Sequence, residues 1–267
     1  MSSLFHRFSW CNARSICFTA LLCLFASTLH ASVLDWPNGG WTAGTPSPGQ
    51  TFAQSFTVDT PNDVTVSINN NGASGTGATW LAPYPQIDST HTTGGFTGVN
   101  GLQLVVTSEA TTSSFIKVVV SFASPVTNLS FQLWDIDANA GQFADTIQNI
   151  QGLTDTSTIV GATSISSAVA GYNTITGSGL STVVTGTASA ANNTNQGTID
   201  VSFVGPITQF SFEWSNTDPG LGQQAIGLGP LAFTVVPEMS AGYFVALVCA
   251  LALISSEISR RVRSTTR

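Results

Sequence analysis

Two related stretches of sequence decide the fold: VSFASPVTNLSF at Val120–Phe131 and VSFVGPITQFSF at Val201–Phe212. Each reads as a strand, a turn at a proline and a second strand, because β-branched and aromatic residues alternate with small polar ones on both sides of Pro125 and Pro206. Alternate residues of a strand share one face, which suits half-buried strands. Two such hairpins related by pseudo-symmetry predict an all-β fold, a single antiparallel β-sandwich that is jelly-roll-like.

The same composition extends over the rest of the body, where Thr, Val, Ser, Phe and Ile form short runs between Gly, Pro and Asn. No amphipathic helical stretch of useful length competes with these runs. Gly152–Gly197 is almost uncharged and predicts exposed or edge strands and loops, and Trp80–Gly101 predicts a long surface loop. The predicted strands are Thr51–Val58, Val64–Asn69, Leu102–Thr107, Phe115–Phe122, Val126–Trp134, Thr198–Val204, Ile207–Trp214 and Leu231–Val235.

Charge restricts the possible partners. Residues 32–235 contain twelve acidic residues and a single basic one, Lys117, for a net charge near −11. Nucleic-acid binding is disfavoured because neutralising phosphates requires clustered Lys and Arg. Recognition of anionic sugars through arginine is disfavoured for the same reason.

The first 31 residues read as a secretory signal peptide. Arg7 and Arg14 form a positive region, Ile16–Ala26 is apolar, and Leu29–Ala31 is a plausible cleavage site. The exported body then spans about 32–235, enough for one domain with a sizeable core. All four cysteines fall outside that body, so it cannot use disulfides or thiolate metal sites; they are Cys11, Cys17, Cys23 and Cys249.

The remaining segment, 236–267, has three parts: a Pro-Glu motif, an apolar run expected to form a membrane helix at about 241–256, and a basic end. Clustered arginines beside a span stay on the cytoplasmic side, so the body faces outward. The residues of the motif are Val236, Pro237 and Glu238, and those of the basic end are Arg260, Arg261, Arg263 and Arg267.

This tail resembles the PEP-CTERM sorting signal of Gram-negative bacteria, with Met239 in place of the usual second proline. The resemblance implies a processing protease of the exosortase type as a partner. It also implies export through the inner membrane to the cell envelope, cell surface or extracellular matrix, with the C-terminus cytoplasmic before any processing. The alternative is a plain C-terminal anchor that is retained.

The body resembles the exported β-sandwich domains of the choice-of-anchor families. The similarity rests on Asn128–Phe131 followed by Asp135–Asp137, and on the closing segment Ala225–Phe233. It implies a cellular setting and no particular activity.

A candidate calcium site follows the first repeat. Alternating oxygen-bearing side chains in a loop can converge on Ca²⁺, which takes six to eight oxygen ligands. The candidate ligands are Asp135, Asp137, Asn139 and Asp145. Ala140 and Thr146 stand where an EF-hand needs glycine and glutamate, so an EF-hand is rejected. The alternative is that these residues only form turns.

Aromatic side chains are the candidates for ligand contact, because sugar rings stack on flat apolar surfaces. Trp134 is the first choice since it adjoins Asp135, and Trp80 and Tyr84 belong to the predicted surface loop. These residues predict binding of an extracellular polysaccharide or of another surface protein.

Catalysis has few candidate residues. His91 is the one histidine of residues 32–235, and no Gly-x-Ser-x-Gly motif is present. Glycoside hydrolysis by two carboxylates, with Glu109, Glu213 or the aspartates, is the less favoured alternative. The sequence therefore predicts a non-catalytic, membrane-sorted surface or matrix protein that binds polysaccharide or a surface component. A purely structural, self-associating matrix protein is the other alternative.

Overall fold

A computed structural model of the chain describes residues 30–36, 40–60, 63–71, 78–89, 98–107, 114–218, 220 and 222–237. The chain divides into Leu29–Val236 and a second unit that combines 1–28 with 237–267. The expected membrane helix, the arginine cluster and all of the expected signal peptide except His30 and Ala31 lie outside the described residues. Where the chain is described, it contains no helix with the length and apolar character needed to cross a membrane.

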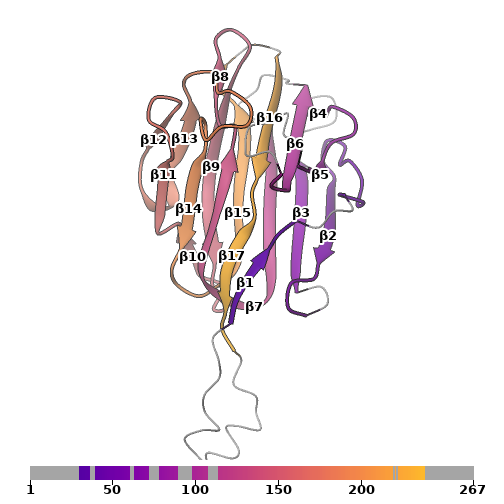
Figure 1. Ribbon diagram of the computed structural model, residues 1–267, viewed down its shortest axis with the longest axis vertical. Coiled ribbons are helices and arrows are strands. Elements are labelled where there is room, and N and C mark those ends of the chain that lie inside the picture. Colours follow the sequence, from indigo (N-terminus) through magenta and orange to yellow (C-terminus); the bar gives the residue numbers. More distant parts are fainter. Residues whose placement is uncertain are drawn as a thin grey trace, which may run out of the picture. The chain divides into compact units, whose positions relative to one another are not determined.

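The described body consists of β-strands and one 3-10 turn, and all strand pairings are antiparallel (Figure 1). This confirms the all-β, antiparallel prediction. The elements are β1 His30–Leu34, β2 Thr51–Phe56, β3 Val64–Asn71, β4 Thr79–Trp80, β5 Gln86–Asp88, β6 Gly101–Thr107, β7 Phe115–Trp134, β8 Ala138–Asn139, β9 Phe143–Leu153, β10 Ile159–Gly161, β11 Ser164–Ser167, β12 Asn173–Thr176, η1 Gly179–Ser181, β13 Val183–Gly186, β14 Ile199–Phe203, β15 Ile207–Asn216, β16 Gln223–Leu228 and β17 Leu231–Val235.

Every predicted strand has a counterpart, although Phe115–Phe122 and Val126–Trp134 join into the single strand β7. The short strands β10 to β13 lie in the segment predicted to carry edge strands, and most of their residues are exposed or half-buried. The long strand β9 was not predicted. Its inward residues change parity at Asn149, whose φ of 52° breaks the alternation that identifies a strand in sequence.

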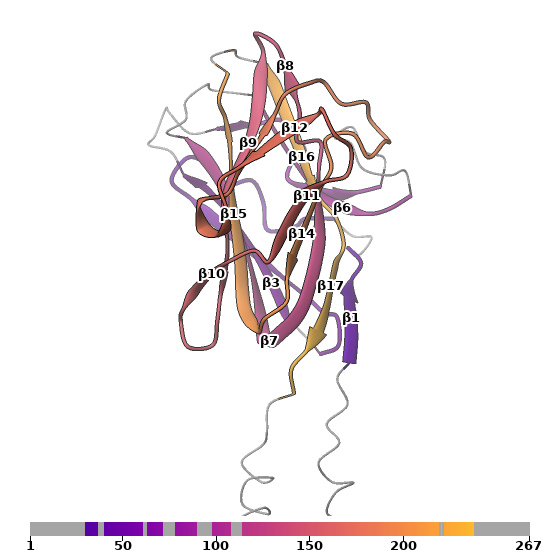
Figure 2. The same cartoon turned by 90° about the vertical axis from the view of Figure 1, so that its left-hand side faces the viewer.

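The prediction that each repeat forms a hairpin is wrong. The first half of β7 pairs with β3 and β15, whereas its second half pairs with β14 and β17 (Figure 2). β14 and β15, which come from the second repeat, both pair with β7. Each repeat therefore passes from one layer of the sheet to the other at its proline, and the two repeats pair with each other in antiparallel fashion.

The crossing reverses which residues of β7 face inward. Ile116 to Phe122 are buried at even positions, but Leu129, Phe131 and Leu133 are buried at odd ones. Asn128 lies between the two sets with φ 51°, a conformation that Asn adopts more readily than most residues. One residue in this conformation thus lets both halves of β7 point into the same core.

Aromatic side chains join the two layers across that core. Phe131 of β7 stacks on Phe210 of β15 with ring centroids 4.5 Å apart, and Phe122 of β7 lies 5.1 Å from Phe233 of β17. Full burial of such side chains contributes roughly 1.5–3 kcal/mol each. A single folded sheet therefore encloses the core as a sandwich.

The chain enters and leaves this body side by side. β1 pairs with β17, so that His30 lies opposite Val235, and the amide of Val236 donates to the carbonyl of Pro125 at 2.8 Å. β1 begins and β17 ends at the lower end of the body in Figure 1, opposite the β8 loop.

Candidate functional site

A groove of about 490 Å³ lies on the outer face of the layer formed by β11, β14, the second half of β7, and β17. Its floor is a row of small side chains that pair directly from strand to strand. The row consists of Ser164, Ser202, Ser130 and Ala232. Because none of these side chains rises far above the sheet, the row leaves a hollow that runs across the strands.

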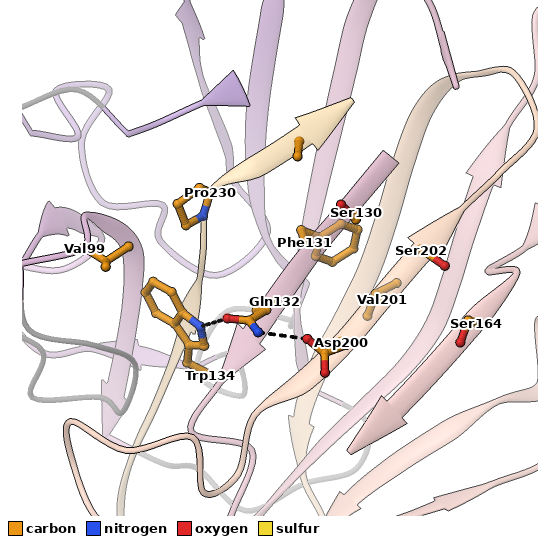
Figure 3. Close-up of a pocket in the computed structure, with 11 residues that line it drawn as sticks. Val99, Ser130, Phe131, Gln132, Trp134, Ser164, Asp200, Val201, Ser202 and Pro230 are labelled. Atoms are coloured by element: carbon orange, nitrogen blue, oxygen red, sulfur yellow. Dashed lines mark hydrogen bonds between the residues drawn. The ribbon is translucent and has the colours of Figure 1, made fainter. Parts of the chain in front are cut away.

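A polar pair borders this floor. Gln132 of β7 lies opposite Asp200 of β14, and its Nε2 donates to Oδ1 of Asp200 at 2.8 Å. Its Oε1 accepts a hydrogen bond of 3.1 Å from Nε1 of Trp134 (Figure 3). The indole and the carboxylate thereby fix the orientation of the amide between them. The groove thus presents a carboxylate held in place, beside serine hydroxyls.

Trp134 is not the exposed stacking surface that we expected, since only 1% of it is accessible. Its ring lies against the backbones of Gly101 and Gly229, where an added Cβ would come within 2.4 Å and 2.7 Å of ring atoms. Trp134 borders the groove together with Val99 and Pro230. Its role in the groove is to close one end and to orient Gln132.

The other two predicted aromatic contacts lie outside the groove. Trp80 is half-buried and its Nε1 donates to the carbonyl of Pro46 at 2.8 Å. Tyr84 is 9% exposed, and its carbonyl accepts from Oγ1 of Thr45 at 3.1 Å. Trp80 thus contacts the 40–50 segment through its side chain, and Tyr84 contacts it through its backbone carbonyl.

Of the predicted calcium ligands, Asp137 and Asp145 interact with each other, whereas Asn139 interacts with a different residue. The buried carboxylates of Asp137 and Asp145 lie close together, and Asp145 Oδ2 accepts from the amide of Asp137 at 3.4 Å. Asp137 Oδ2 also accepts from the amide of Ala190 at 2.6 Å. Asn139 is exposed and donates instead to Gln142 at 3.0 Å.

Burial dominates the protonation of these carboxyls. It raises the pKa of Asp135 to about 8, with the nearby charge of Asp137 adding to the effect. Burial also raises the pKa of Asp137 to about 6, against the opposing hydrogen bonds from Ala190 and Asp145. The pKa of Asp145 is raised well above its ordinary value by burial, despite a hydrogen bond from Trp214. A proton can therefore stabilise this cluster as a cation would.

No group of three or more His, Cys, Asp or Glu side chains is placed to hold a metal ion, as far as the described residues go. Calcium at Asp135, Asp137, Asn139 and Asp145 stays a prediction. Of the sorting motif, Val236 and Pro237 are described, whereas Glu238 is not, and His91 and Glu109 also lie outside the described residues.

Sequence reasoning missed Gln132, Asp200 and the serine row. Ser130 and Ser202 occupy outward positions of the two repeats, and Gln132 and Asp200 occupy the outward positions directly beside them, which the alternation marks as polar. Recognising that they meet requires the register between β7 and β14. That register depends on the crossing of each repeat between layers, which the hairpin interpretation excluded.

Comparison with known proteins gives little further information. No protein-family model matches the sequence, and a search of curated proteins gives no match. One similar solved structure is described as the structural basis for the promiscuous specificity of carbohydrate-binding modules from the β-sandwich superfamily. It is 17% identical, with 77% of this chain and 85% of that chain covered and a TM-score of 0.22, so it says nothing about the ligand of the present chain.

Proposed function

We propose that this protein is a non-catalytic binding module for a neutral polysaccharide, which lies in the groove across β11, β14, β7 and β17. The proposal is carried by the Gln132–Asp200 pair beside a row of serines. A carboxylate and an amide with fixed orientation can each bind sugar hydroxyls, and hydrogen bonds to a charged group are the stronger ones. A hollow crossing several strands also suits an extended chain better than a compact ligand.

The negative charge of the groove and of the body favours binding of neutral polysaccharides over binding of anionic ones. Asp200 borders the groove, and the body carries one basic residue, Lys117, against twelve acidic ones. Like charges brought together without counter-charge disfavour binding. The groove would therefore reject uronic-acid or sulfated chains.

The described lining of the groove offers one carboxylate, Asp200, whereas hydrolysis of a glycosidic bond usually uses two. The groove therefore gives a glycosidase role no support. Binding without cleavage remains our proposal.

We also propose that the body is exported and carried to the cell envelope by its C-terminal tail. The order of Pro-Glu motif, apolar run and arginines supports this setting. The pairing of His30 with Val235 is compatible with it, because it places the two ends of the described body side by side. An exosortase-type protease is the partner that this setting would require.

Retention on immobilised polysaccharide tests the proposed ligand. The full chain should be retained on a neutral β-glucan or galactomannan and should pass through alginate, which is anionic. Asp200→Asn should weaken retention by about tenfold or more, since a hydrogen bond to a charged group contributes roughly 1.5–3 kcal/mol.

Asp155→Asn is the matched control, because Asp155 is exposed in the turn after β9 and away from the groove. It should leave retention unchanged. Passage of the wild-type chain through every neutral polysaccharide would overturn the proposed ligand class. Equal retention of the Asp200→Asn and wild-type chains would exclude the groove as the site. Self-association without retention would favour the purely structural alternative.

A further inference from the structure

Three side chains with complementary chemistry meet on the outer face of the other layer, where β15 lies between β7 and β9. Glu213 of β15 lies opposite Lys117 of β7, and Oε1 of Glu213 is 3.6 Å from Nζ of Lys117. The second carboxylate oxygen, Oε2, accepts a hydrogen bond of 2.6 Å from Nδ2 of Asn149. One carboxylate thus touches both an amine and a primary amide.

The surroundings favour this arrangement over a mobile surface contact. Glu213 is on a strand paired on both sides, and its side chain is only 10% accessible. Asn149 occupies the bulge of β9 with φ 52°, which aims its side chain towards β15 out of step with its neighbours. Lys117 is the only lysine of the whole chain. The backbone therefore holds the amine and the amide at the two oxygens of a single acid.

Amine, amide and a bridging acid are the groups needed to form a new amide bond. A neutral lysine is a nucleophile, and a positioned carboxyl can carry the protons. Holding the reactants together replaces a bimolecular encounter by an intramolecular one, which can raise the effective concentration by many orders of magnitude. When Glu213 carries a proton, the Asn149 amide can turn over and accept it at its carbonyl oxygen, which polarises Cγ.

We propose that Lys117 and Asn149 become joined by an intramolecular amide bond, with Glu213 as the proton carrier. Glu213 takes a proton from the Lys117 ammonium, and the neutral Nζ attacks Cγ of Asn149. The Nζ–Cγ bond forms, the Cγ–Nδ2 bond breaks, and the departing nitrogen collects protons from Glu213 and from Nζ. Ammonium leaves, Glu213 is again a carboxylate, and no oxidant or cofactor is consumed.

The bond would tie β7 to β9 across β15 and close the chain between residues 117 and 149 into a loop. Closing a loop covalently lowers the entropy of the unfolded chain, as a disulfide does. The four cysteines are at positions 11, 17, 23 and 249, outside the body, so it has no disulfide of its own. An amide bond would supply that restraint without a redox requirement.

Trypsin tests the proposal because the chain contains no other tryptic site between Arg14 and Arg260 than Lys117. Trypsin does not cleave after an acylated lysine. The full chain, unfolded in denaturant and then digested, should remain in one piece across residue 117. Its mass should be lower than the mass calculated from sequence by one ammonia.

Asn149→Ala and Glu213→Gln should each restore cleavage after residue 117 and the full calculated mass. Asn149→Asp should keep the link with loss of one water, since an acid can replace the amide. Asn195→Ala is the matched control, because Asn195 is an exposed asparagine in the loop before β14, and it should retain the link. Circular dichroism of each variant verifies that it has folded.

Cleavage of the wild-type chain after Lys117, with the full calculated mass, would overturn the proposal whatever the variants do. Loss of ammonia that persists in Asn149→Ala would overturn the assignment of Asn149 as the partner. Neither result depends on what the groove binds.

Discussion

Trp214 and Asp145 are joined by a buried hydrogen bond in which the indole Nε1 donates to Oδ1 of the carboxyl group at 2.8 Å. Both side chains are almost inaccessible, and Asp145 is completely buried. Among the described residues, the indole and the amide of Asp137 are the donors to a charge at this position. Burial of an incompletely solvated charge is costly, so the folded state retains the proton.

We therefore predict that the protein becomes less stable as pH rises from about 4 to about 8. The pKa values of Asp135 and Asp137 rise on folding from 3.8 to about 8 and about 6, and that of Asp145 rises as well. The folded state then binds more protons than the unfolded state, and their contribution is complete at low pH and lost as pH rises through the folded values. Thermal melts across this range should show a falling melting temperature.

One group acts in the opposite sense but at lower pH. The pKa of Asp63 is lowered because amide donors at Val58, Asp59 and Thr60 together outweigh its partial burial. Its contribution is present above its ordinary value of 3.8 and is lost only below it. A melting temperature that rises steadily between about pH 5 and pH 8 would contradict the assignment of protons to the buried cluster.

The variant Asp135→Asn tests whether a proton or a calcium ion neutralises this cluster of carboxyl groups. Asp135 has φ 63°, a conformation that Asn tolerates, so the substitution removes the charge without straining the backbone. If protons stabilise the cluster, the variant should melt higher than wild type at about pH 8, with a flatter pH profile. Calcium should then have no effect on either chain.

The predicted calcium site gives the opposite result in the same experiment. Ca²⁺ at a hundred times its dissociation constant would stabilise the wild-type body by about 2.7 kcal/mol, and a chelator would reverse this. Asp135→Asn would lose that response. Melts of both chains with calcium and with chelator distinguish the two interpretations.

The repeat shows how far sequence reasoning can go. The eight segments that composition and alternation predicted all lie on strands, two of them on the single strand β7, because buried residues within each segment alternate by a local rule. The same rules failed at Pro125 and Pro206, where strand–turn–strand predicts a hairpin but the chain passes between layers. In a hairpin the two strands of one repeat would pair with each other. Here each strand of one repeat pairs with a strand of the other repeat. Which partner is chosen depends on long-range packing that no window of sequence contains.

The candidate site was predictable only in part for the same reason. Trp134 was predicted to contact a ligand and lies in the lining of the groove, but its burial depends on Gly101 and Gly229, which come from distant segments. Asp200 carries no local signal at all, since a single acid in a strand usually faces solvent. Its pairing with Gln132 becomes visible only with the register.

The crossing of the repeats predicts energetic coupling between Phe131 and Phe210. The rings stack with an interplanar angle of 21° and belong to different copies of the repeat. A double-mutant cycle with Phe131→Leu and Phe210→Leu should give a coupling of about 0.5–1.5 kcal/mol in denaturant unfolding. Phe52→Leu, in the edge strand β2, serves as a control that should add independently of Phe131→Leu. Additivity of Phe131→Leu with Phe210→Leu would show that the layers are not joined by this stack.

Two glycines that touch Trp134 predict how the groove is held open. At Gly229, an added Cβ would come within 2.7 Å of the ring, and at Gly101 within 2.4 Å. Neither ring contact can be relieved without moving the indole, which also orients Gln132 through its hydrogen bond. Gly229→Ala should therefore destabilise the body by about 1–3 kcal/mol, the usual effect of overpacking. It should also shift tryptophan fluorescence and weaken any polysaccharide retention.

Gly205→Ala is the matched control, because an added Cβ there meets nothing within 4 Å, and it should leave all three measurements unchanged. If Gly229→Ala matched Gly205→Ala in stability and fluorescence, Trp134 would not be fixed against the backbone, and its role in orienting Gln132 would be wrong.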